Sequence, residues 1–203
     1  MQWIKFLPSY NDSHTDVSSG DFDDFIQTNE GGYAIVTSYT HTMYIGETWF
    51  VKTDSAGNLK LNKTVENSVY PVALIEGTDG YTILSSSPGR GGSGGKFVIT
   101  KLDSDANTLW FKLYGDNNKN PYATCGAETS DGGYIMGGYM YSPDVSWVVK
   151  ADAQGDMNWN ATYSFANASK LQSIAQAKDG GFIFVGTATS NPIVFDSTTR
   201  ALH

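Results

Sequence analysis

The chain has 203 residues built on an internal repeat, and this feature constrains its fold more than any other. Four similar stretches recur, each a turn with one or two glycines followed by an aromatic residue and an apolar run. Their aromatic residues are Tyr33, Tyr81, Tyr134 and Phe182, spaced 48, 53 and 48 residues apart. A fixed period of this length indicates a series of equivalent supersecondary units.

A second motif follows the first three stretches at nearly the same period. It contains Lys-x-Asp and a turn, with its aspartates at Asp54, Asp103 and Asp152, 49 residues apart. The apolar runs are rich in β-branched and aromatic residues, and the turns contain the Gly and Asn typical of hairpin loops. Each unit should therefore hold four short strands, as a β-propeller blade does. Because the Lys-x-Asp pair recurs in three units, we interpret it as a turn-capping aspartate with a surface lysine, and not as a catalytic dyad.

We therefore predict one all-β domain over residues 1–203, a β-propeller of four blades of about 49 residues. The predicted blades cover residues 22–66, 67–115, 116–164 and 165–203. The fourth unit has a candidate third strand at 193–196, aligned by its Asp196 with the earlier turn aspartates, but no fourth strand. The segment 2–8 matches the fourth strand of the second unit, so we expect this N-terminal strand to complete the last blade and remove an exposed sheet edge. The alternatives are a part of a larger ring of seven or eight blades, or two chains that share one eight-bladed ring.

The repeat motifs also carry a family resemblance. In the first unit the residues that carry it are Gln27-Thr28, Gly31-Gly32-Tyr33, Trp49, Lys52, Asp54 and Gly57-Asn58. In the third unit they are Asp131-Gly132-Gly133-Tyr134, Trp147, Lys150, Asp152, Gly155 and Trp159. They resemble a propeller-repeat family common in surface and secreted proteins of archaea and bacteria, distantly similar to Kelch-type and quinoprotein-type propellers. The resemblance implies an architecture and a cell-surface setting but no activity. The second unit departs from it, with Ala106 at the turn glycine.

Charge and composition exclude several classes of partner. Lys and Arg number 13 against 21 Asp and Glu, a formal net charge of −8, so no basic surface for nucleic acid is expected. No apolar run reaches the ~18–20 residues of a membrane helix, and the first residues lack the apolar region of a signal peptide. Four Asn-x-Ser/Thr sequons, at Asn11, Asn62, Asn160 and Asn167, are candidate glycosylation sites and favour an extracellular or cell-surface location.

Metal binding has one candidate region. Three histidines and the single Cys125 give poor prospects for zinc, and no cofactor is expected. Carboxylates gather in the first connector, so Asp21, Asp23 and Asp24 are the candidate ligands for Ca²⁺, which prefers oxygen. Because the spacing fits no EF-hand, the alternative is a solvated insertion without metal.

No catalytic motif occurs, and no catalytic residue is predicted. We expect a non-catalytic binding, adhesion or structural module that engages another protein or its own copies. Ligand contacts should fall on the loops between second and third strands, at 40–48, 88–95 and 139–144, with Tyr44, Arg90 and Tyr141 as candidates. The alternative from another class is a lectin-like propeller that recognises glycans through Tyr44 and Tyr141. A third reading, a lyase or hydrolase with carboxylates in the funnel, meets the difficulty that the inner strands hold almost no acid or base.

Overall fold

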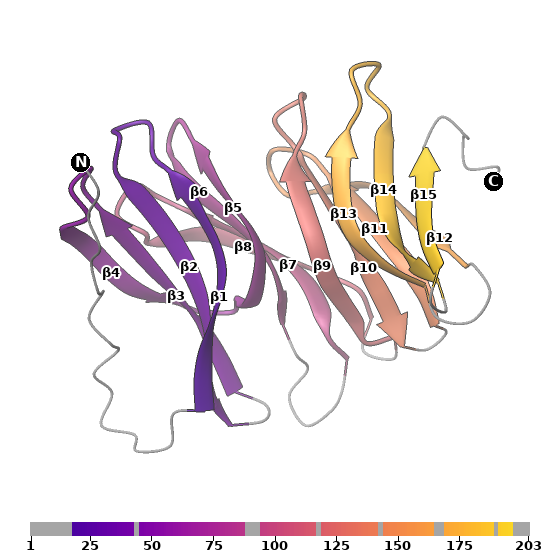
Figure 1. The fold of residues 1–203 in the computed structure, drawn as a ribbon, viewed down its shortest axis with the longest axis horizontal. Helices are drawn as coiled ribbons and strands as arrows, with labels where there is room; N and C mark the ends of the chain where they lie inside the picture. The colour runs from indigo at the N-terminus through magenta and orange to yellow at the C-terminus, as the bar shows by residue number, and fades with distance from the viewer. Residues whose placement is uncertain are drawn as a thin grey trace.

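A computed structural model describes residues 18–42, 45–87, 94–116, 119–141, 144–164, 169–188 and 191–196. These residues form fifteen β-strands in four antiparallel sheets, and no helix occurs among them (Figure 1). Each sheet is assembled in chain order, so every strand pairs with the strand that precedes or follows it.

The first sheet contains β1 (Ser18–Gln27), β2 (Tyr33–Thr42), β3 (Ile45–Thr53) and β4 (Leu59–Val65). The second contains β5 (Val69–Gly77), β6 (Gly80–Ser87), β7 (Lys96–Leu102) and β8 (Thr108–Tyr114). The third contains β9 (Pro121–Glu128), β10 (Tyr134–Tyr141), β11 (Asp144–Ala151) and β12 (Met157–Tyr163). In the last sheet, the described residues form β13 (Ser169–Gln176), β14 (Phe182–Ala188) and β15 (Asn191–Asp196).

The prediction of an all-β chain with a repeated four-stranded unit is confirmed for the first three sheets. The segment 2–8, predicted to complete the last sheet, lies outside the described residues. Two predicted loops are shorter than expected, because β2 continues to Thr42 while β3 starts at Ile45, and β10 continues to Tyr141 while β11 starts at Asp144. Most of 40–48 and 139–144 is therefore strand.

The repeated aspartates cap the hairpin between the third and fourth strands, as predicted. Asp54 accepts hydrogen bonds from the amides of Ala56 (2.9 Å) and Asn58 (2.8 Å), and the Gly57 amide donates to its carbonyl (3.0 Å). Asp103 and Asp152 repeat this pattern. The turn needs a left-handed residue, with φ at +75° for Gly57, +57° for Ala106 and +77° for Gly155.

The prediction of surface lysines in the same motif is wrong. The side chains of Lys52, Lys101 and Lys150 are only 16%, 11% and 6% exposed. Each pairs with an acid of the neighbouring hairpin, between the first and second strands, because antiparallel pairing brings the two hairpins together at one end of the sheet. We call this end of every sheet the turn end.

The alignment of Asp196 with the turn aspartates is also wrong. The partner of Ile183 across the β14–β15 pair is Asp196, whereas the residue that faces Ile135 across the β10–β11 pair is Lys150. Asp196 thus stands at the lysine position of the repeat, two residues before the position that the sequence alignment gave it.

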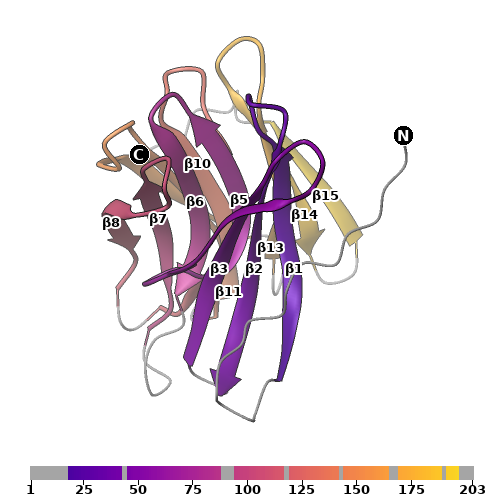
Figure 2. The same cartoon turned by 90° about the vertical axis from the view of Figure 1, so that its left-hand side faces the viewer.

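Adjacent sheets pack face to face through apolar side chains. We call the face of each sheet that lies toward the preceding sheet its leading face. This face carries the repeat aromatics. In the second sheet, for example, Tyr81 packs on Phe50 of the first sheet, with ring centroids 5.0 Å apart. The face toward the following sheet, the trailing face, carries Ala34 and Val36 in the first sheet and Leu84 in the second, all fully buried. The first strands of successive sheets also contact one another (Figures 1 and 2).

The first and last sheets each leave apolar side chains exposed on one face, and we call these two faces the open faces. Figure 1 shows them toward opposite ends of the long axis, and within the described residues the main contacts between sheets link only successive ones. On the trailing face of the last sheet, Ile183 and Val185 are 39% and 38% exposed. On the leading face of the first sheet, Phe25 is 55% exposed, whereas Val51 in the same row of side chains is 1% exposed. The described residues therefore form a series of sheets whose closure into a ring is not shown.

Candidate functional site

Of the three residues predicted to bind ligand, one is described. Tyr44 and Arg90 lie outside the described residues. Tyr141 is the last residue of β10, at the end opposite the turn end, and its side chain is exposed. It belongs to an aromatic cluster.

The tyrosine cluster consists of Tyr122 on β9 with Tyr139 and Tyr141 on β10, next to Lys170 on β13. The rings of Tyr122 and Tyr139 stack at an interplanar angle of 12° with centroids 5.8 Å apart, and Tyr141 meets both edge-on. The hydroxyls of Tyr139 and Tyr141 are hydrogen-bonded at 3.2 Å. The Lys170 ammonium lies 4.5 Å from the centre of the Tyr139 ring, a cation–π contact.

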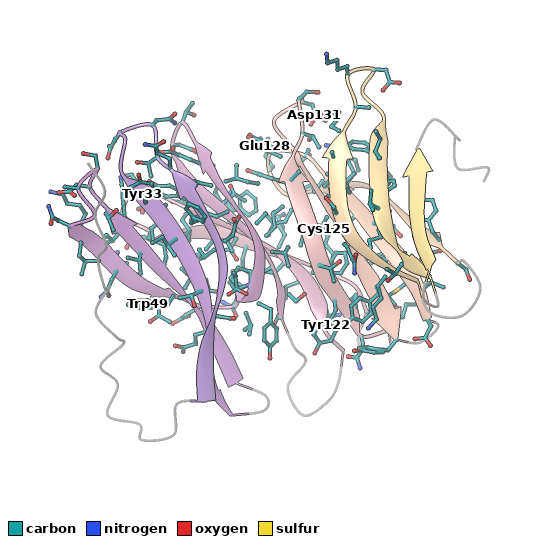
Figure 3. All side chains as sticks on the ribbon, viewed as in Figure 1. Tyr33, Trp49, Tyr122, Cys125, Glu128 and Asp131 are labelled. Atoms are coloured by element: carbon teal, nitrogen blue, oxygen red, sulfur yellow. The ribbon has the colours of Figure 1, made fainter. Side chains whose placement is uncertain are left out.

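This cluster can present aromatic surface and hydroxyl groups together. A tyrosine hydroxyl is protonated at neutral pH, and burial raises the pKa of Tyr122 and of Tyr139 further, so both groups can donate as well as accept hydrogen bonds. Figure 3 shows Tyr122 at the lower end of β9, far from Glu128 at the upper end. The sequence offered Tyr141 as a single candidate; it gave no sign that β-pairing would bring two more tyrosines beside it.

The predicted calcium ligands lie along β1. Asp24 accepts hydrogen bonds from the amides of Phe25 and of Leu74, the second across the boundary with β5, both at 2.8 Å. Asp23 accepts one from the amide of Ser38 on β2. Asp21 pairs with Ser38 in the strand register. Among the described residues no group of three or more His, Cys, Asp or Glu side chains is arranged to hold a metal ion.

The turn end carries a row of ion pairs, one in each of the first three sheets. Lys52 pairs with Glu30 (3.1 Å), Lys101 with Asp79 (2.7 Å) and Lys150 with Asp131 (3.0 Å). Hydrogen bonds from the Thr129 hydroxyl and from Lys150 hold the pKa of Asp131 well below its usual range. Because the same pair recurs in three sheets, we assign it a structural role in joining two hairpins.

In the second and fourth sheets, the acid or amide at the end of the first strand contacts the turn of the preceding sheet. Glu76 of the second sheet accepts a hydrogen bond from the Asn29 amide in the first-sheet turn, at 2.7 Å. Gln176 of the fourth sheet accepts the equivalent one from the Ser130 amide in the third-sheet turn, at 2.7 Å. The equivalent residue of the third sheet is Glu128, and it lines a cavity of about 620 Å³ between the second and third sheets. This cavity was not predicted from the sequence.

Two further features bear on function. Burial raises the pKa of the Cys125 thiol to about 11, so it is protonated at neutral pH and a poor nucleophile. No helix able to span a membrane occurs in the part of the chain that the structure describes.

Comparisons with known proteins give a distant structural likeness and no family. No protein-family model and no curated protein matches the sequence. Among solved structures, the chain is similar to a protein of unknown function from Bacteroides caccae, with a TM-score of 0.41 and 11% sequence identity. The match covers 81% of this chain and 56% of that protein, so the chain spans little more than half its length.

Proposed function

We propose that this chain is a non-catalytic β-propeller module that binds further copies of itself through the two open sheet faces. The observation that carries the proposal is the exposure of Ile183 and Val185 on the trailing face of the last sheet. The equivalent residues of the first sheet, Ala34 and Val36, are fully buried against the second sheet. Apolar side chains at a repeated packing position favour a partner of the same kind.

The leading face of the first sheet offers the complementary surface. Phe25 occupies the position of Leu74 and Ile174, which are buried against the preceding sheets. A second copy can place its last sheet on this face with the packing used three times inside the chain. Two copies joined head to tail at both junctions form a closed assembly, in which four sheets from each chain share one eight-bladed ring.

Of the two ring arrangements, we propose the eight-bladed ring shared by two chains and not the four-bladed ring closed within one chain. In a single-chain ring the last sheet would have to reach the first, and these sheets lie toward opposite ends of the long axis (Figure 1). The family resemblance and the sequons support a cell-surface or secreted location, where such an assembly would act in adhesion or as a structural scaffold.

Sedimentation of a charged variant tests the proposal. Val185→Lys places an ammonium in the proposed junction, where burying an unpaired charge is costly, and should convert the assembly to monomers. Leu113→Lys is the matched control, since Leu113 is an exposed aliphatic residue on β8, away from both open faces. The proposal fails if Val185→Lys leaves the molar mass unchanged or if Leu113→Lys lowers it equally.

Carbohydrate binding is a second candidate function, favoured by the tyrosine cluster. Aromatic faces stack on the apolar faces of sugar rings, and the hydroxyls of Tyr139 and Tyr141 supply hydrogen bonds beside them. A glycan array should then give ligands whose affinity falls about tenfold in Tyr141→Ala. Met157→Ala, an exposed side chain at the turn end, should leave binding intact. An array without ligands, or equal losses in the two variants, would remove this candidate.

A further inference from the structure

One turn breaks the repeat at the cavity between the second and third sheets. In the first, third and fourth sheets, five residues separate the end of the first strand from the repeat aromatic, as between Gln27 and Tyr33. In the second sheet only four residues, 77–80, separate Glu76 from Tyr81. The second sheet therefore has one turn residue fewer. In the first and third sheets, the equivalent turn donates an amide, of Asn29 or of Ser130, to the sheet that follows.

The shorter turn changes the surroundings of Glu128. At the equivalent position Glu76 is engaged by the Asn29 amide, and Gln176 by the Ser130 amide. Among the described residues no side-chain hydrogen bond or ion pair engages the Glu128 carboxylate, and this side chain is exposed and lines the cavity. A carboxylate held at a fixed strand end is thus available to a ligand.

The cavity is larger than its counterpart one junction earlier. Between the first and second sheets the equivalent hollow, lined by Lys52, Leu61 and Ser104, has a volume of about 350 Å³. Between the second and third sheets it has a volume of about 620 Å³, and Trp110 takes the place of Leu61. The missing turn residue and the enlarged cavity thus occur at the same junction.

The walls of the cavity combine negative charge with aromatic surface. Glu76, Asp79 and Glu128 line it together with one cation, Lys101, which is paired with Asp79 at 2.7 Å. Three carboxylates against one ammonium leave an excess of negative charge. The aromatic wall is formed by Trp110 and Tyr134, and the Tyr134 hydroxyl is already hydrogen-bonded to Thr82 at 3.0 Å.

We infer that this cavity binds an organic cation, a guanidinium or ammonium group, with Glu128 as its counter-ion and Trp110 as its aromatic wall. A carboxylate gives such a group a charge-assisted hydrogen bond, and an indole ring attracts it through its π-face. A volume of this size suits a basic side chain or a small free amine. The site lies at the turn end, away from the tyrosine cluster, and does not depend on the proposed self-assembly.

The test titrates the protein with argininamide and follows the indole N–H signal of Trp110 by NMR. Wild type should show saturable shifts, and the neutral acetyl-leucinamide should show none. Glu128→Gln should weaken argininamide binding about tenfold, since a hydrogen bond between charged groups is lost. Glu66→Gln, which removes an exposed carboxylate from the turn between β4 and β5, is the matched control and should bind like wild type.

A restored turn gives a second test that keeps Glu76, Glu128 and Trp110 unchanged. Replacing residues 77–80 by the five-residue sequence of the third-sheet turn, 129–133, keeps the aspartate that pairs with Lys101. This variant should fold like wild type and lose argininamide binding, because the added amide engages Glu128. Unchanged binding in this variant or in Glu128→Gln, or no Trp110 shift in wild type, would overturn the inference. Tighter binding of acetyl-Gly-Arg-Gly-amide than of argininamide would identify a polypeptide side chain as the ligand, and the reverse order a free amine.

Discussion

At the scale of single residues, the ion pairs of the turn end explain why lysines are kept in a largely buried position. Lys150 is nearly buried, donates to both oxygens of Asp131 at 3.0 and 3.1 Å, and also donates to the Ala151 carbonyl at 2.9 Å. A buried ammonium needs such partners, because desolvation disfavours its charge. The pair therefore orients two hairpins and adds little beyond this to stability.

The same pair predicts a pH dependence. Because the pKa of Asp131 is lower in the folded protein than its ordinary value of 3.8, its contribution to the free energy of unfolding is present above that value and lost as the pH falls below it. Asp131→Asn should destabilise the protein at pH 7 by on the order of 1 kcal/mol. The gap to wild type should close between about pH 5 and pH 2. Urea unfolding of both proteins across this range measures the gap, and a gap that stays constant would contradict the assignment.

At the scale of elements, the hairpin turns show how a repeat varies without losing its form. The turn residue with positive φ is Gly155 in the third sheet, where an added Cβ would lie 2.8 Å from the Trp110 ring. One junction earlier the same position holds Ala106, which is buried in a cluster against which Leu61 packs. Leu61 is the counterpart of Trp110, so the smaller side chain accompanies the alanine and the larger one accompanies the glycine.

This pairing predicts the cost of adding a methyl group at two glycines. Gly132 and Gly155 have nearly the same φ, +75° and +77°, but a Cβ on Gly132 would meet nothing within 4 Å. Gly132→Ala should therefore cost only the left-handed backbone strain, about 1 kcal/mol. Gly155→Ala should cost at least about 1 kcal/mol more, because it also overpacks Trp110.

Urea unfolding of the two variants measures the difference in the free energy of unfolding. Trp110→Leu should remove the extra cost in a double-mutant cycle, since it recreates the pair found one junction earlier. Equal losses for the two single variants, or no rescue by Trp110→Leu, would contradict this explanation.

The elements also show what the sequence could predict. Strand number and order in the first three sheets followed from the spacing of Tyr33, Tyr81 and Tyr134, because a repeated pattern averages out local ambiguity. The error at Asp196 arose because a strand of six residues with no turn motif after it left the register unspecified, and only its pairing with β14 fixed it. The buried lysines were missed because their acidic partners lie on another hairpin. Tyr122 and Glu128 were missed because their surroundings depend on neighbouring strands and sheets.

At the scale of the whole molecule, the three internal junctions between sheets contrast with the two open faces. Each internal junction buries a cluster of apolar side chains from both sheets, including Trp147 against Phe97 at a ring distance of 4.7 Å. The open faces carry Phe25, Ile183 and Val185. These three side chains are exposed, although their repeat equivalents are buried in the internal junctions. Within the described residues, the sheets therefore pack on one another at the three junctions and leave apolar side chains exposed at the two ends of the series.

The central claim is that these two ends meet on different copies of the chain. Sedimentation equilibrium of the wild-type protein tests it most directly, because the chain mass of 22.0 kDa separates a monomer from a two-chain ring without ambiguity. We predict a discrete species of twice that mass that persists on dilution, since each ring has two identical junctions. A stable species of 22.0 kDa at all concentrations would contradict the claim and favour a ring closed within one chain.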